Sequence, residues 1–199
     1  MARTTREQTE ATRQAILGAA LALFATRGAD GVGLEEIARV AGVTRGAVYH
    51  HFGSRQGVFS AVHDQVQATV AAAIDAATAD VPDPWESLER GCRAFLEAAV
   101  APAVRQVLLV DAPRMLGWDA WRGADAANSG RMLGDVLREL ADRGVIAVGP
   151  VDATQALLSG AMNEAALWAA TLPDPQRGVE EAWGVLRRML ASLRVGARA

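Results

Sequence analysis

The chain of 199 residues contains no lysine, a single tyrosine and a single cysteine, Cys92. One cysteine excludes an intrachain disulfide framework, and a lone thiol inside an apolar helix is expected to be a buried packing residue. The sequence has no run of 18 uncharged apolar residues, and its polar N-terminus lacks a signal-peptide pattern. We therefore expect a cytoplasmic protein without a membrane partner.

Strand-like segments are also missing from the sequence. Aromatic residues make up 5% of the chain, and no stretch of Val, Ile, Thr and Tyr alternates with polar residues as half-buried strands do. Ala and Leu, which favour helices, are abundant instead. The composition predicts an all-α protein.

The formal net charge of −3 argues at first against a nucleic-acid partner, but the charge is unevenly distributed. Residues 1–60 carry seven arginines against five acidic groups, a net charge of +2. Residues 61–199 carry thirteen arginines against eighteen acidic groups, a net charge of −5. Because a nucleic acid responds to the local charge, the N-terminal part of the chain remains a candidate for binding one.

Apolar spacing, capping residues and glycine or proline breaks predict about nine helices. The proline-rich segment 81–84 is the clearest break in the chain. We expect an N-terminal domain at 1–54 and a C-terminal domain at 55–199, connected by the helix that starts the second domain. The predicted helices span 6–26, 34–40, 45–52, 55–79, 84–100, 102–111, 118–143, 151–171 and 175–195.

The stretch "LEEIARVAGVTRGAVYHHFGSR", residues 34–55, has the pattern of a helix-turn-helix. Two short helices meet at a glycine turn, and the second helix is rich in groups that bind phosphate. Thr44 is a natural N-cap for that second helix, and Ser54 can cap the helix after it. The expected small core contains Ile37, Ala38, Val43, Val48 and Phe52.

Two adjacent histidines in this stretch, His50 and His51, raise the alternative of a metal site. At 100° per residue His50 points away from the core that contains Val48, while Tyr49 and His51 fall on opposite shoulders of the helix. Adjacent helical residues cannot readily share one ion, and no Cys or carboxylate stands at ligand spacing, so we expect no metal. A pair of solvated surface histidines is the other alternative, but it does not explain the neighbouring phosphate-binding groups.

On these residues the chain resembles the TetR (TetR/AcrR) family of transcriptional regulators, most specifically through "IARVAGVTRGAVYHHF". The resemblance covers about residues 10–62. It implies an all-α homodimer with an N-terminal three-helix helix-turn-helix domain that binds double-stranded operator DNA. It further implies a C-terminal helical domain for ligand binding and dimerisation. We expect a protein that is not an enzyme and that needs no cofactor.

The resemblance assigns DNA-binding roles position by position. Thr44, Tyr49 and His51 match positions that contact phosphates, and Arg55 matches a basic residue that contacts the backbone. Arg45, Gly46, Ala47 and His50 match the positions that face the groove. Arg45 is the candidate for reading guanine, with phosphate as its alternative target. Gly33 departs from the family's usual Thr or Ser, which removes one expected phosphate contact.

The C-terminal half offers a dimer interface and a pocket. We expect the interface at helices 151–171 and 175–195, through Ala156, Leu157, Gly160, Ala161, Leu167 and Trp168 on the first and Trp183, Leu186, Leu190 and Leu193 on the second. An internal two-helix core in a monomer is the alternative. The predicted pocket residues are Phe95, Leu108, Met115, Trp118, Trp121, Met132 and Asn163; ordinary core packing is an equal alternative for the apolar ones, while Asn163 needs a polar partner if it is buried.

The functional hypothesis is a repressor that a small, mostly apolar ligand releases from a palindromic operator. An activator or a ligand-independent regulator of the same fold is the alternative. An enzyme that uses His50, His51 or His63 as a general base is disfavoured, because no acid or nucleophile accompanies them in a recognisable pattern.

Overall fold

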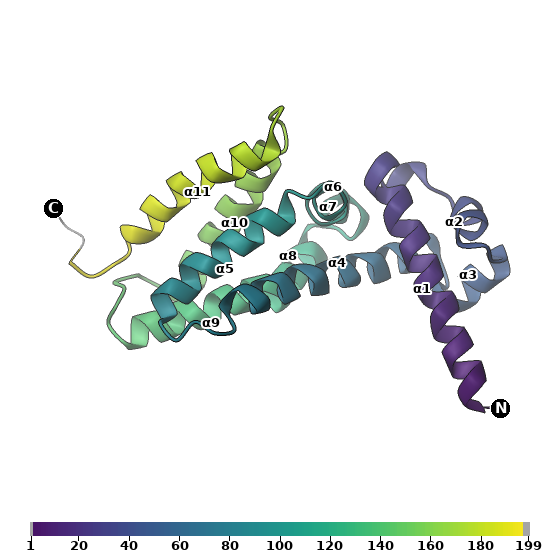
Figure 1. Ribbon diagram of the computed structural model, residues 1–199, viewed down its shortest axis with the longest axis horizontal. Helices are drawn as coiled ribbons and strands as arrows, with labels where there is room; N and C mark the ends of the chain where they lie inside the picture. Colours follow the sequence, from purple (N-terminus) through teal and green to yellow (C-terminus); the bar gives the residue numbers. More distant parts are fainter. Residues whose placement is uncertain (1, 197–199) are drawn as a thin grey trace. The chain divides into compact units, whose positions relative to one another are not determined.

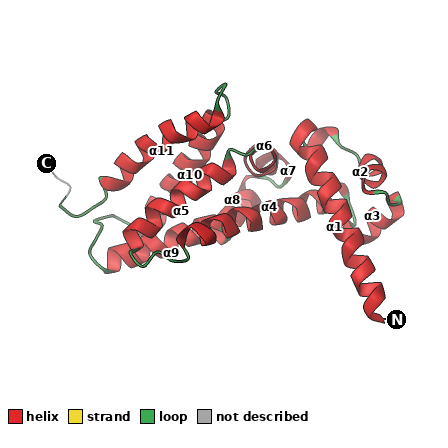
Figure 2. Ribbon diagram, in the orientation of Figure 1, coloured by secondary structure: helices red, strands yellow, loops and turns green. Residues whose placement is uncertain are grey.

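The structure is a computed structural model that describes residues 2–196, with side chains described from residue 6 onward. These residues form helices joined by short turns, which confirms the all-α prediction (Figure 2). The one extended pairing among them is an isolated bridge between Ile146 and Arg194. None of the helices in this part of the chain is both long and apolar enough to cross a membrane.

The described chain divides into two compact units. The first extends to Val66 and also contains Gln106–Trp121, while the second comprises Gln67–Arg105 and the chain from Arg122 on. The helix that follows the helix-turn-helix, α4 (Arg55–Thr78), contributes to both units. The domain boundary that we expect between residues 54 and 55 stays a prediction, since compactness alone does not define a domain.

The first unit is built on a long helix, α1 (Ala2–Arg27), and two short ones, α2 (Leu34–Ala41) and α3 (Arg45–Phe52) (Figure 1). Both α1 and α3 pack against α2. The unit also contains a 3-10 turn (Ala29–Gly31), a π-helical stretch (Gln106–Asp111), α7 (Ala112–Met115) and the start of α8 (Trp118–Ala127). Its fully buried side chains include Ile16, Phe24, Val32, Ile37, Val48 and Phe59.

The second unit is a layered helical bundle. Its helices are α5 (Pro84–Ala99), α6 (Pro102–Arg105), α9 (Ser129–Asp142), α10 (Val151–Ala169) and α11 (Pro175–Ala191). α5 packs against α9, α10 and α11, and α10 packs against α9 and α11. Asp83 and Asp174 cap α5 and α11 by accepting hydrogen bonds from backbone N–H groups of the first turn, each followed by proline.

Two predicted helices differ from the structure. The helix expected at 118–143 is broken between α8 and α9 at Asn128, whose φ of −115° and ψ of −110° leave the helical region. Its side-chain Nδ2 donates to the carbonyl of Ala124 at 2.8 Å, a local bond by which Asn competes with the helix. The helix expected at 102–111 continues through the π-helical stretch to Met115.

One predicted apolar stripe faces inward. Leu186 and Leu190 on α11 are 4% and 0% exposed, so the expectation that they form an intersubunit surface is wrong. They fill the core of the second unit instead. The large apolar side chains that α11 exposes are Val185 and Met189, while α10 exposes Leu157 and Trp168, as the sequence predicts.

Candidate DNA-binding helix and ligand cavity

The turn between α2 and α3 is tight and glycine-dependent. Gly42 has a φ of 68°, in the left-handed region that favours glycine, and ends α2 with its N–H bonded to carbonyls of the last turn. The N–H of Val43 then donates to the carbonyl of Ala38 at 3.0 Å. At the other end of α2, Gly33 is the N-cap without a side-chain hydrogen bond, as expected from its lack of a hydroxyl.

Thr44 begins α3, and its Oγ1 accepts a hydrogen bond from the N–H of Ala47 at 3.1 Å. The helix buries Val48 completely. On the same helix Tyr49 is 63% exposed, His50 is exposed and His51 is half-buried. The rings of the two histidines meet edge to face, with centroids 5.6 Å apart. The helix therefore presents polar side chains to solvent from the face opposite its buried valine.

The two arginines of the predicted DNA surface are held by carboxylates. The Arg45 guanidinium donates to Oε1 of Glu35 on α2 at 2.8 Å, and both side chains are largely exposed. The Arg55 guanidinium donates to the carbonyl of Asp30 at 3.1 Å and lies 3.7 Å from its carboxylate. An exposed ion pair is worth about 1 kcal/mol or less, so Arg45 can exchange Glu35 for another anion at little cost.

The junction of α3 and α4 depends on residues that the DNA-binding prediction does not include. Ser54 caps α4 by accepting a hydrogen bond from the N–H of Gly57 at 3.0 Å, as its sequence position predicts. A Cβ atom on Gly57 would overlap the carbonyl oxygen of Phe52, the last residue of α3. Gly57 therefore lets α4 start directly against the end of α3, and only the three-dimensional structure reveals this requirement.

A buried carboxylate, Asp111, fixes the loop that follows α1. Its side chain is 0% exposed and accepts hydrogen bonds from the N–H of Ala29 at 2.8 Å, from Gln106 Nε2 at 3.1 Å and from the Arg114 guanidinium at 2.7 Å. These bonds satisfy a loop N–H that would otherwise be buried without a partner. The sequence prediction missed this residue, because its partners lie as far as 82 positions away.

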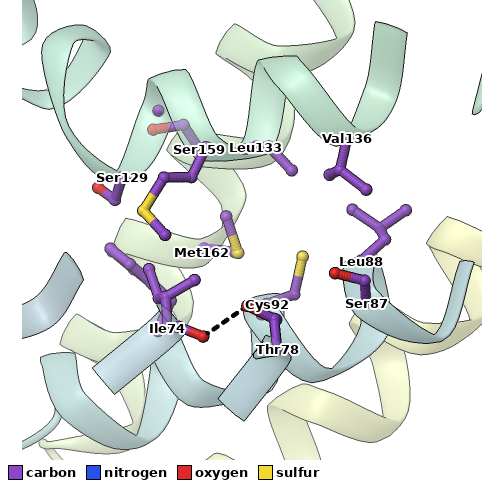
Figure 3. Close-up of a pocket in the computed structure, with 14 residues that line it drawn as sticks. Ile74, Thr78, Ser87, Leu88, Cys92, Ser129, Leu133, Val136, Ser159 and Met162 are labelled. Carbon is purple, nitrogen blue, oxygen red and sulfur yellow. Dashed lines mark hydrogen bonds between the residues drawn. The ribbon is translucent and has the colours of Figure 1, made fainter. Parts of the chain in front are cut away.

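The second unit contains a cavity of about 150 Å³ (Figure 3). α4, α5, α9 and α10 contribute its walls. Most of the lining is apolar or sulfur-containing, and four hydroxyl side chains interrupt it. The lining residues are Ile74, Thr78, Ser87, Leu88, Gly91, Cys92, Phe95, Ser129, Gly130, Met132, Leu133, Val136, Ser159 and Met162.

A second buried carboxylate, Asp125, is not part of the cavity lining but accepts hydrogen bonds from two serines that are. Ser129 Oγ donates to Asp125 Oδ1 at 3.3 Å, and Ser159 Oγ donates to Oδ2 at 2.7 Å. Arg122 pairs with the same Oδ2 at 3.5 Å from an adjoining polar hollow, which Asp125 and Ser159 also line. The three residues other than Arg122 are each less than 9% exposed.

The thiol of Cys92 is buried in the cavity wall. Burial raises the pKa of this thiol to about 12, and the negative charge of Glu89 adds to the effect. The group is therefore a neutral thiol at physiological pH rather than a reactive thiolate. Among the described residues no group of three or more His, Cys, Asp and Glu side chains is placed to hold a metal ion.

Both the N-terminal and the C-terminal part of the chain match models of a known protein family. A model described as bacterial regulatory proteins, tetR family, matches residues 16–62, and one described as tetracyclin repressor-like, C-terminal domain, matches 85–193. A crystal structure of a TetR-family transcriptional regulator from Pectobacterium atrosepticum is 31% identical and superimposes with a TM-score of 0.77 over 97% of this chain and 99% of that one. The chain belongs to the TetR family. Members of this family are DNA-binding transcriptional regulators and not enzymes.

Curated TetR-family relatives match about half of the chain. The HTH-type transcriptional regulator AcrR of Shigella flexneri is 36% identical over 110 residues, which are 55% of this chain and 51% of that protein. The HTH-type transcriptional repressor BepR of Brucella suis biovar 1 (strain 1330) is 36% identical over 107 residues, 53% of this chain and 51% of that protein. The chain thus spans about half the length of the curated relatives it matches.

The structure brings the predicted DNA-binding residues of this TetR-family member together. Thr44, Arg45, Gly46, Ala47, Tyr49, His50 and His51 lie on or directly before α3, and Arg55 begins α4. Of the small core expected behind them, Ile37, Ala38 and Val48 are buried, while Val43 and Phe52 are half-buried. Whether these residues contact DNA stays a prediction.

The predicted pocket residues are not all brought together. Phe95 and Met132 line the cavity, and Asn163 is buried on α10 beside the lining residue Met162 without being part of the wall. Leu108, Met115, Trp118 and Trp121 belong to the first unit, where the Trp121 indole N–H donates to the carbonyl of Leu108 at 2.9 Å. Apart from Asn163, the prediction consisted of large apolar residues, and it missed the lining residues Ser129 and Ser159 and their partner Asp125.

Proposed function

We propose that this TetR-family protein is a transcriptional repressor of the cytoplasm. As a homodimer it binds a palindromic operator through α3, and a small, mostly apolar ligand in the C-terminal cavity releases it. The observation that carries the proposal is the exposed polar face of α3, which combines Thr44, Tyr49 and His50 on one short, capped helix. Such a helix fits the major groove, and its shoulders meet the phosphates on either side.

The contacts divide by chemistry. Thr44, Tyr49 and His51 carry donors for phosphate, and the Arg55 guanidinium adds a charge at the start of α4. Gly46 and Ala47 are small enough to let the helix lie deep in the groove. Arg45 reads a guanine after it leaves Glu35, since the N7 and O6 atoms of guanine accept hydrogen bonds from two N–H groups of its guanidinium.

Dimerisation supplies the affinity that one helix-turn-helix lacks, because two half-sites double the contacts. The exposed apolar side chains of α10 and α11 support helices 151–171 and 175–195 as the interface. Leu157 is 76% exposed, Trp168 42%, Val185 51% and Met189 47%. Gly160 lies on the same exposed face of α10 and allows a partner helix to approach closely.

Ligand control requires a difference in affinity between two conformations of the regulator. An occupied cavity has to favour the conformation in which the two recognition helices no longer match the operator half-sites. One relative, BepR, is a transcriptional repressor, which supports the direction of control that we propose. Regulation that no ligand abolishes would point instead to a ligand-independent regulator of the same fold.

Footprinting on the DNA upstream of the regulator's own gene tests the proposal. We expect protection of an inverted repeat, with a strong dependence on salt because phosphate contacts release counterions. If no inverted repeat is protected at salt low enough for non-specific binding, operator binding is ruled out. Transcription that falls when the protein is removed would identify an activator rather than a repressor.

Point variants of α3 link the protection to these residues. Tyr49→Phe and His51→Ala each remove a proposed phosphate contact, and operator affinity is expected to fall about 10- to 150-fold in each, at about 1.5–3 kcal/mol for a hydrogen bond to a charged group. Both side chains are at least partly exposed, so the unfolding temperature should stay near that of the parent. Arg131→Ala, an exposed arginine on α9, serves as the control and should leave both quantities unchanged.

A further inference from the structure

We propose that the cavity selects its ligand by the direction of hydrogen bonding. It takes a compact, mostly apolar molecule that donates a hydrogen bond, of the phenol or small-alcohol class, and rejects ethers and carboxylates of similar size. This inference rests on the proposed function, in which the cavity binds the effector.

The decisive feature is that the hydroxyls beside Asp125 have already used their protons. A carboxylate only accepts hydrogen bonds, and each serine hydroxyl has one proton to give. Ser159 donates its proton to Asp125 Oδ2 at 2.7 Å, and Ser129 donates to Oδ1 at 3.3 Å. The two serine oxygens therefore offer only lone pairs toward the cavity. A ligand group that forms a hydrogen bond with either serine oxygen has to be the donor.

The other hydroxyls of the wall extend this pattern. Thr78 Oγ1 donates to the carbonyl of Ile74 at 2.9 Å, the bond drawn as a dashed line in Figure 3, so it too presents an acceptor. The fourth hydroxyl, that of Ser87 on α5, can donate or accept. Three of the four hydroxyls that line the cavity thus face a ligand as acceptors.

The charge at this end disfavours an anionic ligand. Asp125 is 8% exposed, and its neighbours on the cavity side are the neutral hydroxyls of Ser129 and Ser159. A ligand carboxylate would bring a second negative charge and two more acceptors to the end of the wall where Ser129 and Ser159 offer only acceptors. Arg122 is paired with Asp125 from the adjoining hollow and is not part of the cavity lining.

Size and lining restrict the rest of the molecule. A cavity of 150 Å³ lined by apolar side chains is large enough for benzene. Leu88, Leu133 and Val136 supply branched apolar walls, and Figure 3 shows the sulfur atoms of Cys92 and Met162 between them and Ser129. Polarizable sulfur and a neutral thiol suit an aromatic ring, so phenol satisfies size, lining and hydrogen-bond direction together.

Calorimetry and thermal unfolding of the full chain with three probes test the inference. Phenol donates a hydrogen bond, anisole replaces that proton with a methyl group, and benzoate is an anionic acceptor. We expect phenol to bind about tenfold more tightly than anisole, because one lone pair of the cavity stays unsatisfied with the ether, and benzoate to leave the unfolding temperature unchanged. Equal or tighter binding of anisole, binding of benzoate, or absence of a phenol effect would each overturn the inference.

An isosteric variant reverses the hydrogen-bond direction. In Asp125→Asn the amide donates to one serine, which turns that hydroxyl proton toward the cavity, so the preference for phenol over anisole should shrink or invert. Asp142→Asn, an exposed carboxylate at the end of α9, is the matched control and should keep the parent preference. If Asp125→Asn does not fold, Ser159→Ala removes one acceptor and should weaken phenol binding several-fold, and an unchanged affinity would count against the inference.

The probe series is measured without DNA, so it is independent of the operator experiment. Operator protection combined with the wrong order of probes would remove this inference and leave the proposed DNA binding intact. The expected order of probes without operator protection would remove the proposed regulator and leave the cavity chemistry intact.

Discussion

Threonine and serine hydroxyls are used in opposite directions at the two candidate sites. On α3, Thr44 Oγ1 accepts from the N–H of Ala47, three residues away, and keeps its own proton for an outside acceptor such as phosphate. In the cavity, Ser159 gives its proton to Asp125, 34 residues away, and keeps its lone pairs for an outside donor. The same chemical group thus prepares one site for an anion and the other for a donor.

The two sites also differ in what holds their polar groups. α3 exposes Tyr49 and His50 to water, so we expect their replacement to alter DNA binding more than folding. Buried carboxylates organise the interior, namely Asp125 next to two serines of the cavity wall and Asp111 at the loop after α1. Their replacement leaves partners without hydrogen bonds, which costs free energy of unfolding.

The largest expected effect is that of Asp111→Ala. The substitution leaves the buried N–H of Ala29 without an acceptor and removes bonds to Gln106 and Arg114. At about 1–3 kcal/mol for each buried group left unsatisfied, the free energy of unfolding should fall by about 3 kcal/mol. Urea denaturation followed by circular dichroism measures it. Asp119→Ala, an exposed residue of α8, should change it by less than about 0.5 kcal/mol, and equal effects of the two would refute the role of Asp111.

Gly57→Ala tests whether DNA binding by α3 depends on the close packing of α3 against the start of α4. Its methyl group would overlap the carbonyl oxygen of Phe52, so α3 and α4 have to move apart, at a cost of about 2 kcal/mol by analogy with overpacked cores. Operator affinity should fall with stability, unlike in the surface variants. The matched control is Gly18→Ala in α1, where a Cβ meets nothing within 4 Å, and helix propensity predicts a gain of about 0.5–1 kcal/mol.

Thr44→Val and Thr44→Ser separate the two uses of one hydroxyl. Valine keeps the shape but loses both the cap and the outward proton, so we expect a loss of about 1 kcal/mol in stability and about tenfold in operator affinity. Serine keeps both functions and should resemble the parent in thermal unfolding and in gel-shift titrations. A Thr44→Val protein with parental operator affinity would show that the proton has no acceptor in the complex.

Sequence reasoning succeeded where partners are local and stopped where they are distant. Helical periodicity predicts α2 and α3 to within about one residue, with the caps Thr44 and Ser54, since the governing bonds span three or four positions. The helix expected at 118–143 is wrong at Asn128 because an Asn side chain can either remain in a helix or end it.

The cavity was the least predictable part of the molecule for a related reason. Large apolar residues such as Leu108 and Phe95 look equivalent in the sequence, yet the fold places them in different units. The hydrogen-bonded cluster beside the cavity consists of Asp125, Ser129 and Ser159, which come from three different helices. Their spacing in the sequence does not predict this arrangement.

The smallest expected effect concerns His63, which is buried on α4 and 1% exposed. Burial lowers the pKa of its imidazole, against a smaller opposing effect of Asp64. Below a pH of about 6.5, the usual pKa of histidine, the unfolded chain binds a proton that the folded chain does not, so the free energy of unfolding should fall as the pH drops. His63→Gln should flatten this slope between pH 7.5 and 5.5, by less than about 1.4 kcal/mol per pH unit, whereas His50→Gln, an exposed residue of α3, should leave it unchanged. If both variants keep the parental dependence of the unfolding free energy on pH in urea titrations, His63 does not set the acid sensitivity of the first unit. The difference between buried and exposed residues would then not include the effect of protonation on stability.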